Sequence, residues 1–134
     1  MADNFFQKFK FSKEQTQNFF TGAKESLYIA ENDEFLNVKF NYSYNALLKA
    51  SIALLSLHNL KVRGIPGHHI KLIEKASEIM KDNDIEIMAD LMRQKRNMDL
   101  YDGGIDVTDK ECREYFCFVK NVLDRIGEEI NKDK

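Results

Sequence analysis

Residues that break regular structure are scarce in this chain, and their placement constrains its fold more than any other feature. One proline and six glycines occur in 134 residues, and most of them gather at residues 64–67 and 103–104. Because glycine and proline are the strongest breakers of helices and strands, the long stretches outside these two clusters favour uninterrupted helices. We therefore expect an all-α fold, an antiparallel bundle of about five helices without a sheet.

Capping signals and apolar spacing set the expected helix bounds. Ser12 and Gln15 have the spacing of a capping box, which marks a helix start, and Thr108 with Glu111 repeats it. Asp102 followed by two glycines is a stop signal. Apolar side chains three and four residues apart then predict helices over about residues 12–32, 33–58, 68–81, 82 or 84–101, and 108–130. We expect the second helix to be the most buried and the last to pack along its whole length.

The chain fits a single domain over residues 1–134, in which residues 1–11 form an N-terminal arm. A chain of this length buries a core without disulfides or metals, and no repeat or linker divides it. Residues 4–11 contain four phenylalanines and two lysines, which suits a docking arm or a short extra helix. Packing of this arm on the core or across a dimer is favoured over contact with a membrane. Together with the long apolar stripe of the last helix, the arm predicts a homodimer.

The charge balance limits the classes of partner. Charged residues make up 31% of the chain but the net charge is -2, so any site for an anion must be local rather than a global basic field. No apolar run reaches the roughly 18 residues that suggest a membrane span. The first eleven residues also lack the layout of a signal peptide. We expect a soluble cytoplasmic protein with no membrane partner.

Common metal and cofactor motifs are missing. His68 and His69 are adjacent, so on a helix their side chains diverge by about 100° and do not chelate one metal as an i, i+4 pair does; a place at a helix start suits them better. Cys112 and Cys117 lie five residues apart, on different helix faces, and are expected to be buried or half-buried thiols in a reducing compartment. No Gly-rich loop follows a strand. The sequence therefore predicts no metal and no cofactor.

A basic segment interrupts the apolar periodicity of the fourth expected helix. Arg93, Lys95 and Arg96 place three cations within four positions, where they repel one another. Arg93, Asn97 and Tyr101 follow at i, i+4 and i+8, so they share one helix face, and Arg96 lies beside it. Guanidinium groups bind phosphate oxygens in a bidentate manner, and an amide or a phenol can hold the same group. This face predicts a phosphate site formed by Arg93, Arg96 and Asn97.

A purely structural interpretation of the segment is also open. In that interpretation an arginine of the segment pairs with Asp99, Asp102 or an acid on a neighbouring helix. Asn97 and Tyr101 would then tie the helix end to the following loop. Guanidinium groups that face a cleft would support phosphate binding, whereas groups locked against acids of their own subunit, far from any groove, would support the structural interpretation.

Several segments carry a resemblance to a known superfamily. They are YNALLKA at residues 44–50 with ALL at 53–55, GHH at 67–69, RQKRN at 93–97 and DLYDGG at 99–104. Over about residues 12–130 the chain resembles the HEPN superfamily (higher eukaryotes and prokaryotes nucleotide-binding domain). The resemblance implies a small antiparallel helical bundle that commonly dimerises. Many members carry an Arg-x4-6-His motif at the dimer cleft, with a polar residue directly after the arginine, and cleave RNA without a metal. Others are partners of small nucleotidyltransferases.

On this resemblance the catalytic residues would be Arg96, Asn97 and Tyr101. Arg96 followed by the polar Asn97 matches the first half of the motif, while Tyr101 stands where the histidine should be. A phenol with a pKa near 10 stays protonated at neutral pH, whereas an imidazole with a pKa near 6.5 exchanges its proton readily. Phosphate binding therefore survives this change better than proton transfer does. His68 or His69, from the next helix or a partner subunit, is the alternative proton carrier.

Three functions remain open at this point. The first is a HEPN-like module that binds a nucleotide, an RNA phosphate or a protein partner, including the toxin-side or companion subunit of a nucleotidyltransferase pair. The second is a metal-independent endoribonuclease of toxin or antiphage type, in which Arg96 stabilises the charge of the phosphorane and Asn97 positions it. The third is a helical bundle with no ligand. The tyrosine at position 101 favours the binding module.

Overall fold

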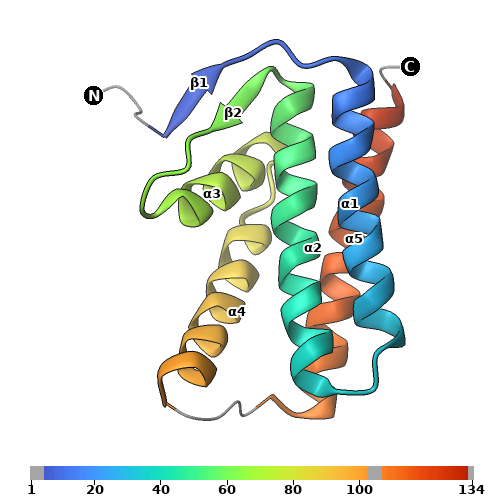
Figure 1. The fold of residues 1–134 in the computed structure, drawn as a ribbon, viewed down its shortest axis with the longest axis vertical. Helices are drawn as coiled ribbons and strands as arrows, with labels where there is room; N and C mark the ends of the chain where they lie inside the picture. The colour runs from blue at the N-terminus through green and yellow to red at the C-terminus, as the bar shows by residue number, and fades with distance from the viewer. Residues whose placement is uncertain (1–4, 103–106, 133–134) are drawn as a thin grey trace.

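Five helices and one small sheet form the part of the chain that this computed structural model describes, residues 5–102 and 107–132 (Figure 1). Their order is β1 (Phe6–Lys8), α1 (Lys13–Asn32), α2 (Leu36–Leu57), β2 (Leu60–Val62), α3 (His68–Met80), α4 (Asn83–Asp102) and α5 (Asp109–Lys132). The long helices α1, α2 and α5 stand side by side, and α3 and α4 lie along the other side of α2. The expected helical bundle is confirmed.

Both predicted capping boxes are present. The hydroxyl of Ser12 accepts a hydrogen bond from the backbone N–H of Gln15 at 3.1 Å, and the Gln15 side chain accepts one from Ser12 at 2.8 Å. At the start of α5, the Thr108 hydroxyl accepts from the Glu111 N–H at 3.0 Å, and the Glu111 carboxylate accepts from the Thr108 N–H at 3.1 Å. These reciprocal bonds satisfy N–H groups that the first turn of a helix leaves free, which is why the local sequence sets both starts.

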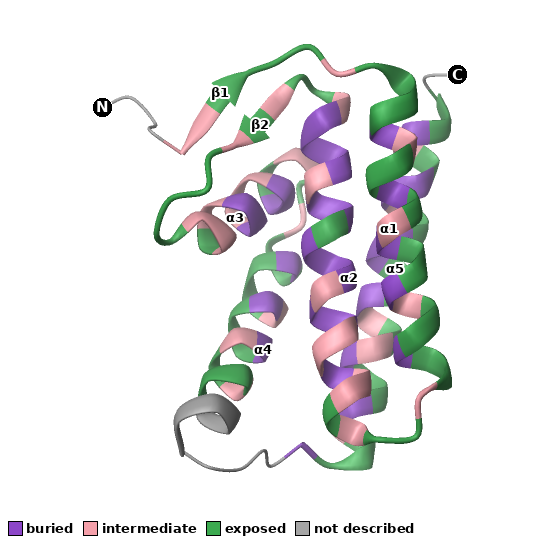
Figure 2. Cartoon of the chain, viewed as in Figure 1, coloured by how far each residue is buried: buried purple, intermediate pink, exposed green. Residues whose placement is uncertain are grey.

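The core centres on α2, as expected (Figure 2). One hydrophobic cluster draws side chains from all five helices, and Phe40, Leu47 and Leu54 of α2 are fully buried within it. The ring of Phe40 meets the edge of Tyr115 on α5 at 5.7 Å between centroids. Buried side chains also follow α5 from its first turn to its last, at Cys112, Tyr115, Val119, Val122, Leu123, Ile126 and Ile130. The last helix thus packs along its whole length.

The prediction of no sheet is wrong. β1 pairs with β2 in an antiparallel register, with Phe6 opposite Val62 and Lys8 opposite Leu60. Asn59 turns the chain with a positive φ of 58°, and its backbone and side-chain oxygens accept hydrogen bonds from the N–H groups of Phe9 and Phe11. A strand of three residues is too short to show an alternating pattern in the sequence, and its backbone bonds decide it instead.

The N-terminal arm lies on its own chain rather than forming an extra helix. Phe6 packs against the core, and the ammonium of Lys75 lies 5.4 Å from the centre of its ring. Lys71 takes the same position over Phe5, at 5.6 Å. Since both lysines belong to α3, the arm and α3 are joined by cation–π contacts as well as by the sheet.

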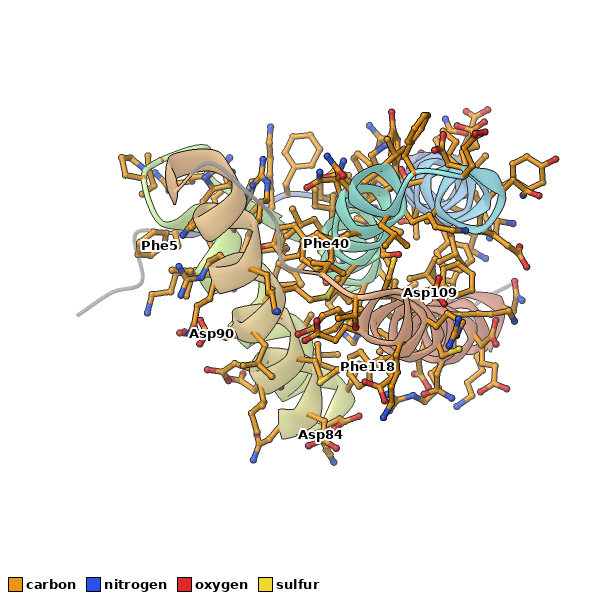
Figure 3. All side chains as sticks on the ribbon, turned by 90° about the horizontal axis from the view of Figure 1, so that it is seen from below. Phe5, Phe40, Asp84, Asp90, Asp109 and Phe118 are labelled. Carbon is orange, nitrogen blue, oxygen red and sulfur yellow. The ribbon has the colours of Figure 1, made fainter. Side chains whose placement is uncertain are left out.

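A layer formed by α3 and α4 packs against α2 and contributes to the same core. Figure 3 shows α4 on one side of α2, with α1 and α5 on the opposite side. Two ion pairs connect this layer to α5: Arg125 lies 2.8 Å from Asp82, and Lys95 lies 3.1 Å from Glu111. Large apolar side chains on α4 remain exposed, among them Ile87 at 55% and Leu91 at 44%.

The two cysteines differ in exposure. Cys112 is buried, and its thiol lies 3.8 Å from the carbonyl oxygen of Leu36. Cys117 is exposed, so the expectation that both thiols would be buried or half-buried is wrong for this residue. Five residues of an α-helix turn the side chain by about 140° from the starting face, which carries Cys117 away from the core.

None of the helices in the described part of the chain is both long enough and apolar enough to cross a membrane.

Candidate functional site

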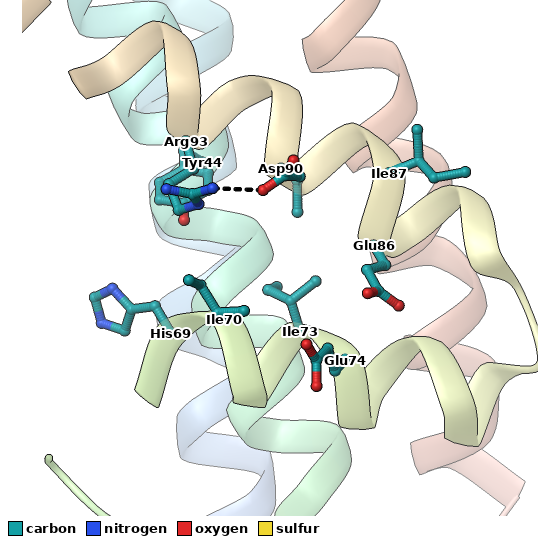
Figure 4. A pocket seen from close by; sticks show the side chains of 10 residues that line it. Tyr44, His69, Ile70, Ile73, Glu74, Glu86, Ile87, Asp90 and Arg93 are labelled. Atoms are coloured by element: carbon teal, nitrogen blue, oxygen red, sulfur yellow. Dashed lines mark hydrogen bonds and ion pairs between the residues drawn. The ribbon is translucent and has the colours of Figure 1, made fainter. Parts of the chain in front are cut away.

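A pocket of about 380 Å³ lies between α3 and α4, and Tyr44 of α2 contributes to its wall (Figure 4). Ile70 and Ile73 of α3 face it from one side, and Ile87 of α4 lies on the other. Its volume falls in the range of roughly 300–1,000 Å³ that is usual for small-molecule sites. The predicted basic segment borders this pocket through Arg93.

Local sequence explains how α3 and α4 form the pocket. Gly67 precedes α3 with a φ of 83°, a left-handed conformation that glycine adopts without steric cost, and α3 begins at the next residue. This places both histidines in the first turn of α3, as expected. At the other end of α3, the Ser77 hydroxyl donates a hydrogen bond to the carbonyl oxygen of Asp82 at 2.6 Å. That bond closes the turn from which α4 starts.

Arg93 is held by an acid of its own helix. Its Nη2 lies 2.6 Å from the Oδ1 atom of Asp90, and the Gln94 amide donates a hydrogen bond to the other oxygen of the same carboxylate. The Nε atom of Arg93 is buried and has no acceptor among the described residues. The structural interpretation therefore applies to part of this guanidinium, with Asp90 of the same helix as the acid. A buried N–H without an acceptor costs roughly 1–3 kcal/mol, so this donor favours an added acceptor.

Arg96 is arranged differently. Its side chain is exposed, and its guanidinium carbon lies 5.9 Å from the centre of the Tyr44 ring. Among the described side chains, no carboxylate pairs with it. A guanidinium over an aromatic face keeps most of its N–H groups available, because the ring attracts the cation without accepting conventional hydrogen bonds. Arg96 does not line the pocket itself, but its contact with Tyr44 places its guanidinium beside the pocket wall.

The other two predicted site residues contribute less to this geometry. Asn97 is exposed on α4, one residue beyond Arg96. Tyr101 belongs to the last turn of α4, and its side chain lies outside the described residues, as do those of Asp99 and Asp102. The expected shared face of Arg93, Asn97 and Tyr101 is therefore described only for its first two members.

Lys95, the third cation of the segment, turns away from the pocket. Its ammonium lies 3.1 Å from the Glu111 carboxylate and joins α4 to α5. The pKa of that carboxyl is lowered, chiefly by the hydrogen bond from the Thr108 backbone and then by Lys95. The three cations that are close in sequence therefore do three different things: Arg93 pairs along its own helix, Lys95 bridges two helices, and Arg96 lies over Tyr44.

His69 brings an imidazole to the same region. It lines the pocket near the end at which Tyr44 and Arg93 lie (Figure 4). Burial lowers the pKa of His69 below its ordinary value, and the charges of His68 and Arg96 lower it further. The imidazole is consequently neutral at neutral pH and has a nitrogen that accepts a proton or a hydrogen bond.

Tyr44 supplies the complementary donor. Burial raises the pKa of its phenol, while the charges of Arg96 and Arg93 oppose that rise. The phenol therefore keeps its proton at neutral pH and can donate it in a hydrogen bond. A neutral imidazole, a protonated phenol and the guanidinium of Arg93, which is paired with Asp90, line this end of the pocket, and Arg96 lies beside them over Tyr44. We call Tyr44, His69, Arg93 and Arg96 the basic end.

The opposite end of the pocket is acidic. Glu74 of α3 and Glu86 of α4 lie together there, away from His69 and Arg93 (Figure 4). Lys71 lies 3.3 Å from the Glu74 carboxylate, whereas no cation of the described residues pairs with Glu86. We call Glu74 and Glu86 the acidic end. Ile70 and Ile73 form an apolar wall between the two ends, and Ile87 lies beyond Glu86 (Figure 4).

Sequence reasoning missed part of this site. Tyr44 was expected only as a member of the apolar stripe of the second helix, and His69 was an alternative proton carrier without a spacing rule to support it. No periodicity relates residues on three different helices, so only their packing brings them together. The buried stripe of α2 also contains Phe40 and Ser51, so neither an aromatic ring nor a hydroxyl by itself distinguishes Tyr44 in the sequence.

No protein-family model, curated protein or solved structure matches this chain. In the described ranges, no three or more histidine, cysteine, aspartate or glutamate side chains are grouped so that they could hold a metal ion.

Proposed function

We propose that this protein is a HEPN-like module that binds the phosphate group of a nucleotide or an RNA at the basic end of the α3–α4 pocket. The observation that carries the proposal is the position of Arg96, which lies over Tyr44, has no carboxylate partner among the described side chains, and is close enough to His69 to lower its pKa. Guanidinium groups form short, charge-assisted hydrogen bonds with phosphate oxygens. A local cluster of this kind suits a chain whose net charge is slightly negative.

Each residue of the basic end has a distinct part in the proposal. Arg96 provides the principal charge, because Asp90 already neutralises part of Arg93. The phenol of Tyr44 donates a hydrogen bond to a phosphate oxygen. Asn97 can add its amide from the exposed face of α4. The site needs neither a metal nor another cofactor for binding.

A binding experiment tests this proposal directly. A short single-stranded RNA and a 5'-mononucleotide are titrated into the full chain in the presence of EDTA at low salt. We expect Arg96→Ala to weaken binding by about tenfold or more, since a hydrogen bond to a charged group contributes roughly 1.5–3 kcal/mol. Arg113→Ala is the matched control, because it removes the same charge from an exposed position on α5, where Arg113 pairs with Asp109.

Two results would contradict phosphate binding at this site. One is equal affinity of Arg96→Ala, Arg113→Ala and the unmodified chain for both ligands. The other is a melting temperature that falls by several degrees in Arg96→Ala with no change in any affinity, which would support the purely structural interpretation of the segment.

An endoribonuclease of toxin or antiphage type is the second candidate, and the position of His69 favours it. A neutral imidazole near Arg96 supplies what Tyr101 lacks at the motif position. In this scheme His69 takes the proton of a 2'-hydroxyl, the 2'-oxygen attacks phosphorus, and Arg96 stabilises the charge of the phosphorane. The 5'-oxygen leaves and takes a proton from water, and the product carries a 2',3'-cyclic phosphate. Cyclic ends that disappear in His69→Gln and in Arg96→Ala would identify the enzyme.

The proposal includes a homodimer, with a nucleotidyltransferase-type protein as the alternative partner. Its support is the exposed apolar face of α4, where Ile87 and Leu91 lie one helical turn apart beside the pocket. Light scattering at micromolar concentration tests the dimer. A monomer that becomes no larger with concentration would exclude it, and Leu91→Glu should convert a dimer into a monomer.

A further inference from the structure

We infer that the ligand of the α3–α4 pocket is a nucleotide whose base carries an exocyclic amine, with its phosphate at the basic end and the amine at the acidic end. Adenine, guanine and cytosine have such an amine, whereas uracil does not. This inference rests on the proposed function, because it assigns the phosphate to Arg93 and Arg96. It adds which bases the pocket accepts, and this preference is argued from the acidic end of the same pocket.

The first observation is that the two ends of the pocket differ in charge: Arg93, which is paired with Asp90, lies at one end with Arg96 beside it over Tyr44, and two carboxylates line the other. Arg93 and His69 lie at one end of the view in Figure 4, and Glu74 and Glu86 at the other. A ligand with negative groups at both ends would be repelled by the two carboxylates. A ligand with one anionic group and one group of hydrogen-bond donors matches both ends.

The second observation is that the carboxylates of the acidic end can accept further hydrogen bonds. Glu86 is exposed and has no cation partner among the described residues. Among the described residues, Lys71 is the one cation that pairs with Glu74, and the two side chains are 42% and 39% exposed. Exposed ion pairs of this kind contribute little, so the Glu74 carboxylate can accept further hydrogen bonds. An ionised carboxylate accepts but never donates, and it offers about four lone-pair positions.

The third observation concerns the apolar side chains of the pocket, of which Ile70 lies between the two ends and Ile87 lies at the acidic end, beyond Glu86 (Figure 4). Ile70 and Ile87 line the pocket, and each is substantially exposed, at 43% and 55%. Apolar side chains that flank a pocket can cover the flat faces of a base, as they do in proteins that hold a base out of its stack. Burying these two side chains under a base would also remove apolar surface from water.

These features together discriminate between bases. The amine of adenine, guanine or cytosine can donate to the carboxylates of Glu74 and Glu86. Uracil instead presents carbonyl oxygens on both sides of a single N–H, and those oxygens would face the carboxylates without a proton between them. A well-placed pair of such contacts discriminates between bases by about tenfold or more.

The test compares AMP, GMP, CMP, UMP and inorganic phosphate by titration calorimetry on the full chain. We expect the three amine-bearing nucleotides to bind about tenfold more tightly than UMP, and inorganic phosphate to bind most weakly. In the double variant Glu74→Gln/Glu86→Gln, amides of the same shape can donate to the uracil carbonyls. The preference for AMP over UMP should therefore fall to about unity.

The controls separate a change in the base site from a change in the fold. Glu78→Gln removes an exposed carboxylate of α3 outside the pocket, where Glu78 pairs with Lys75, and should leave the AMP preference unchanged. The single variant Glu86→Gln breaks no ion pair among the described residues, so it tests the same contact if the double variant is unstable. We expect it to reduce the preference by about half on a logarithmic scale.

The failure of this inference is distinguishable from the failure of the proposed function. UMP and AMP binding with equal affinity, each weakened by Arg96→Ala, would overturn the base assignment and leave the phosphate site intact. An AMP preference that survives in both glutamine variants would overturn the role of Glu74 and Glu86. A chain that binds no nucleotide and no phosphate would overturn both proposals.

Discussion

The two sides of α2 are packed in different ways. On one side, α1 and α5 bury their apolar side chains against α2 and begin at well-formed capping boxes. On the other side, α3 and α4 bury side chains such as Leu72 and Met92 in the same core, but they also enclose the pocket, where the buried Nε atom of Arg93 has no acceptor among the described residues. The comparison teaches that α3 and α4 have one face packed into the core and another that borders the pocket, and that the candidate site uses the second, since a surface that already satisfies its own groups has little left for a ligand.

The largest expected effect is on stability, and it compares a buried side chain of α2 with an exposed side chain of α4. Leu54 is fully buried in α2, whereas Leu91 on α4 is 44% exposed. We expect Leu54→Ala to lower the free energy of unfolding by about 2–5 kcal/mol, because it leaves a cavity in a packed core. Leu91→Ala should change it by less than about 0.5 kcal/mol. Urea denaturation of both variants measures the difference, and similar losses would show that Leu91 is packed as tightly as Leu54.

The second prediction concerns the close approach of α1 and α5. A Cβ atom at Gly127 would lie 3.1 Å from the Phe20 ring, tighter than ordinary contact. We expect Gly127→Val to destabilise the protein by about 1–3 kcal/mol, since both helices would have to separate. Gly22→Val is the matched control, because a Cβ atom there meets only Lys49 at 3.9 Å. Thermal unfolding of both variants decides the matter, and equal melting temperatures would contradict the tight contact.

The smallest expected effect is the pH dependence of stability that His69 contributes in the pocket. The pKa of His69 is lowered in the folded protein, mainly by burial, so below its ordinary value near 6.5 the unfolded chain binds protons that the folded chain does not. Stability should therefore fall as the pH decreases through and below about 6.5. Melting temperatures at about pH 5 and pH 7 measure this contribution. The fall in melting temperature should be smaller in His69→Gln. If this variant has the same pH dependence as the unmodified chain, His69 does not contribute to it.

The local features of the fold were predictable from particular residues. Ser12 with Gln15 and Thr108 with Glu111 form the capping boxes that their spacing indicated. The burial of α2 and of the whole of α5 follows from apolar periodicity, because side chains three and four apart share a helix face. The β1–β2 pair and the exposure of Cys117 were not predicted. A strand of three residues is too short to show an alternating pattern, and the residue type of Cys117 does not show whether its helix face contacts another helix or the solvent.

The candidate site was also predictable only in part. The sequence indicated Arg93, Arg96 and Asn97, and the structure places Arg93 in the pocket wall and Arg96 over Tyr44. It did not indicate that Lys95 would bridge to α5, or that Tyr44 and His69 would join the arginines. Cations that are neighbours in sequence were separated by the partners that packing brought to each of them.

The order of residues by itself determined which segments are helical, where two of the helices start and which faces they bury, because capping and periodicity act over only a few residues. Tertiary packing alone decided that α3 and α4 enclose a pocket with a basic end and an acidic end, since its polar groups come from three helices and no local rule relates them. The amino-acid sequence thus encodes the elements through short-range contacts, and the charge distribution of the pocket arises from the long-range arrangement of those elements around α2.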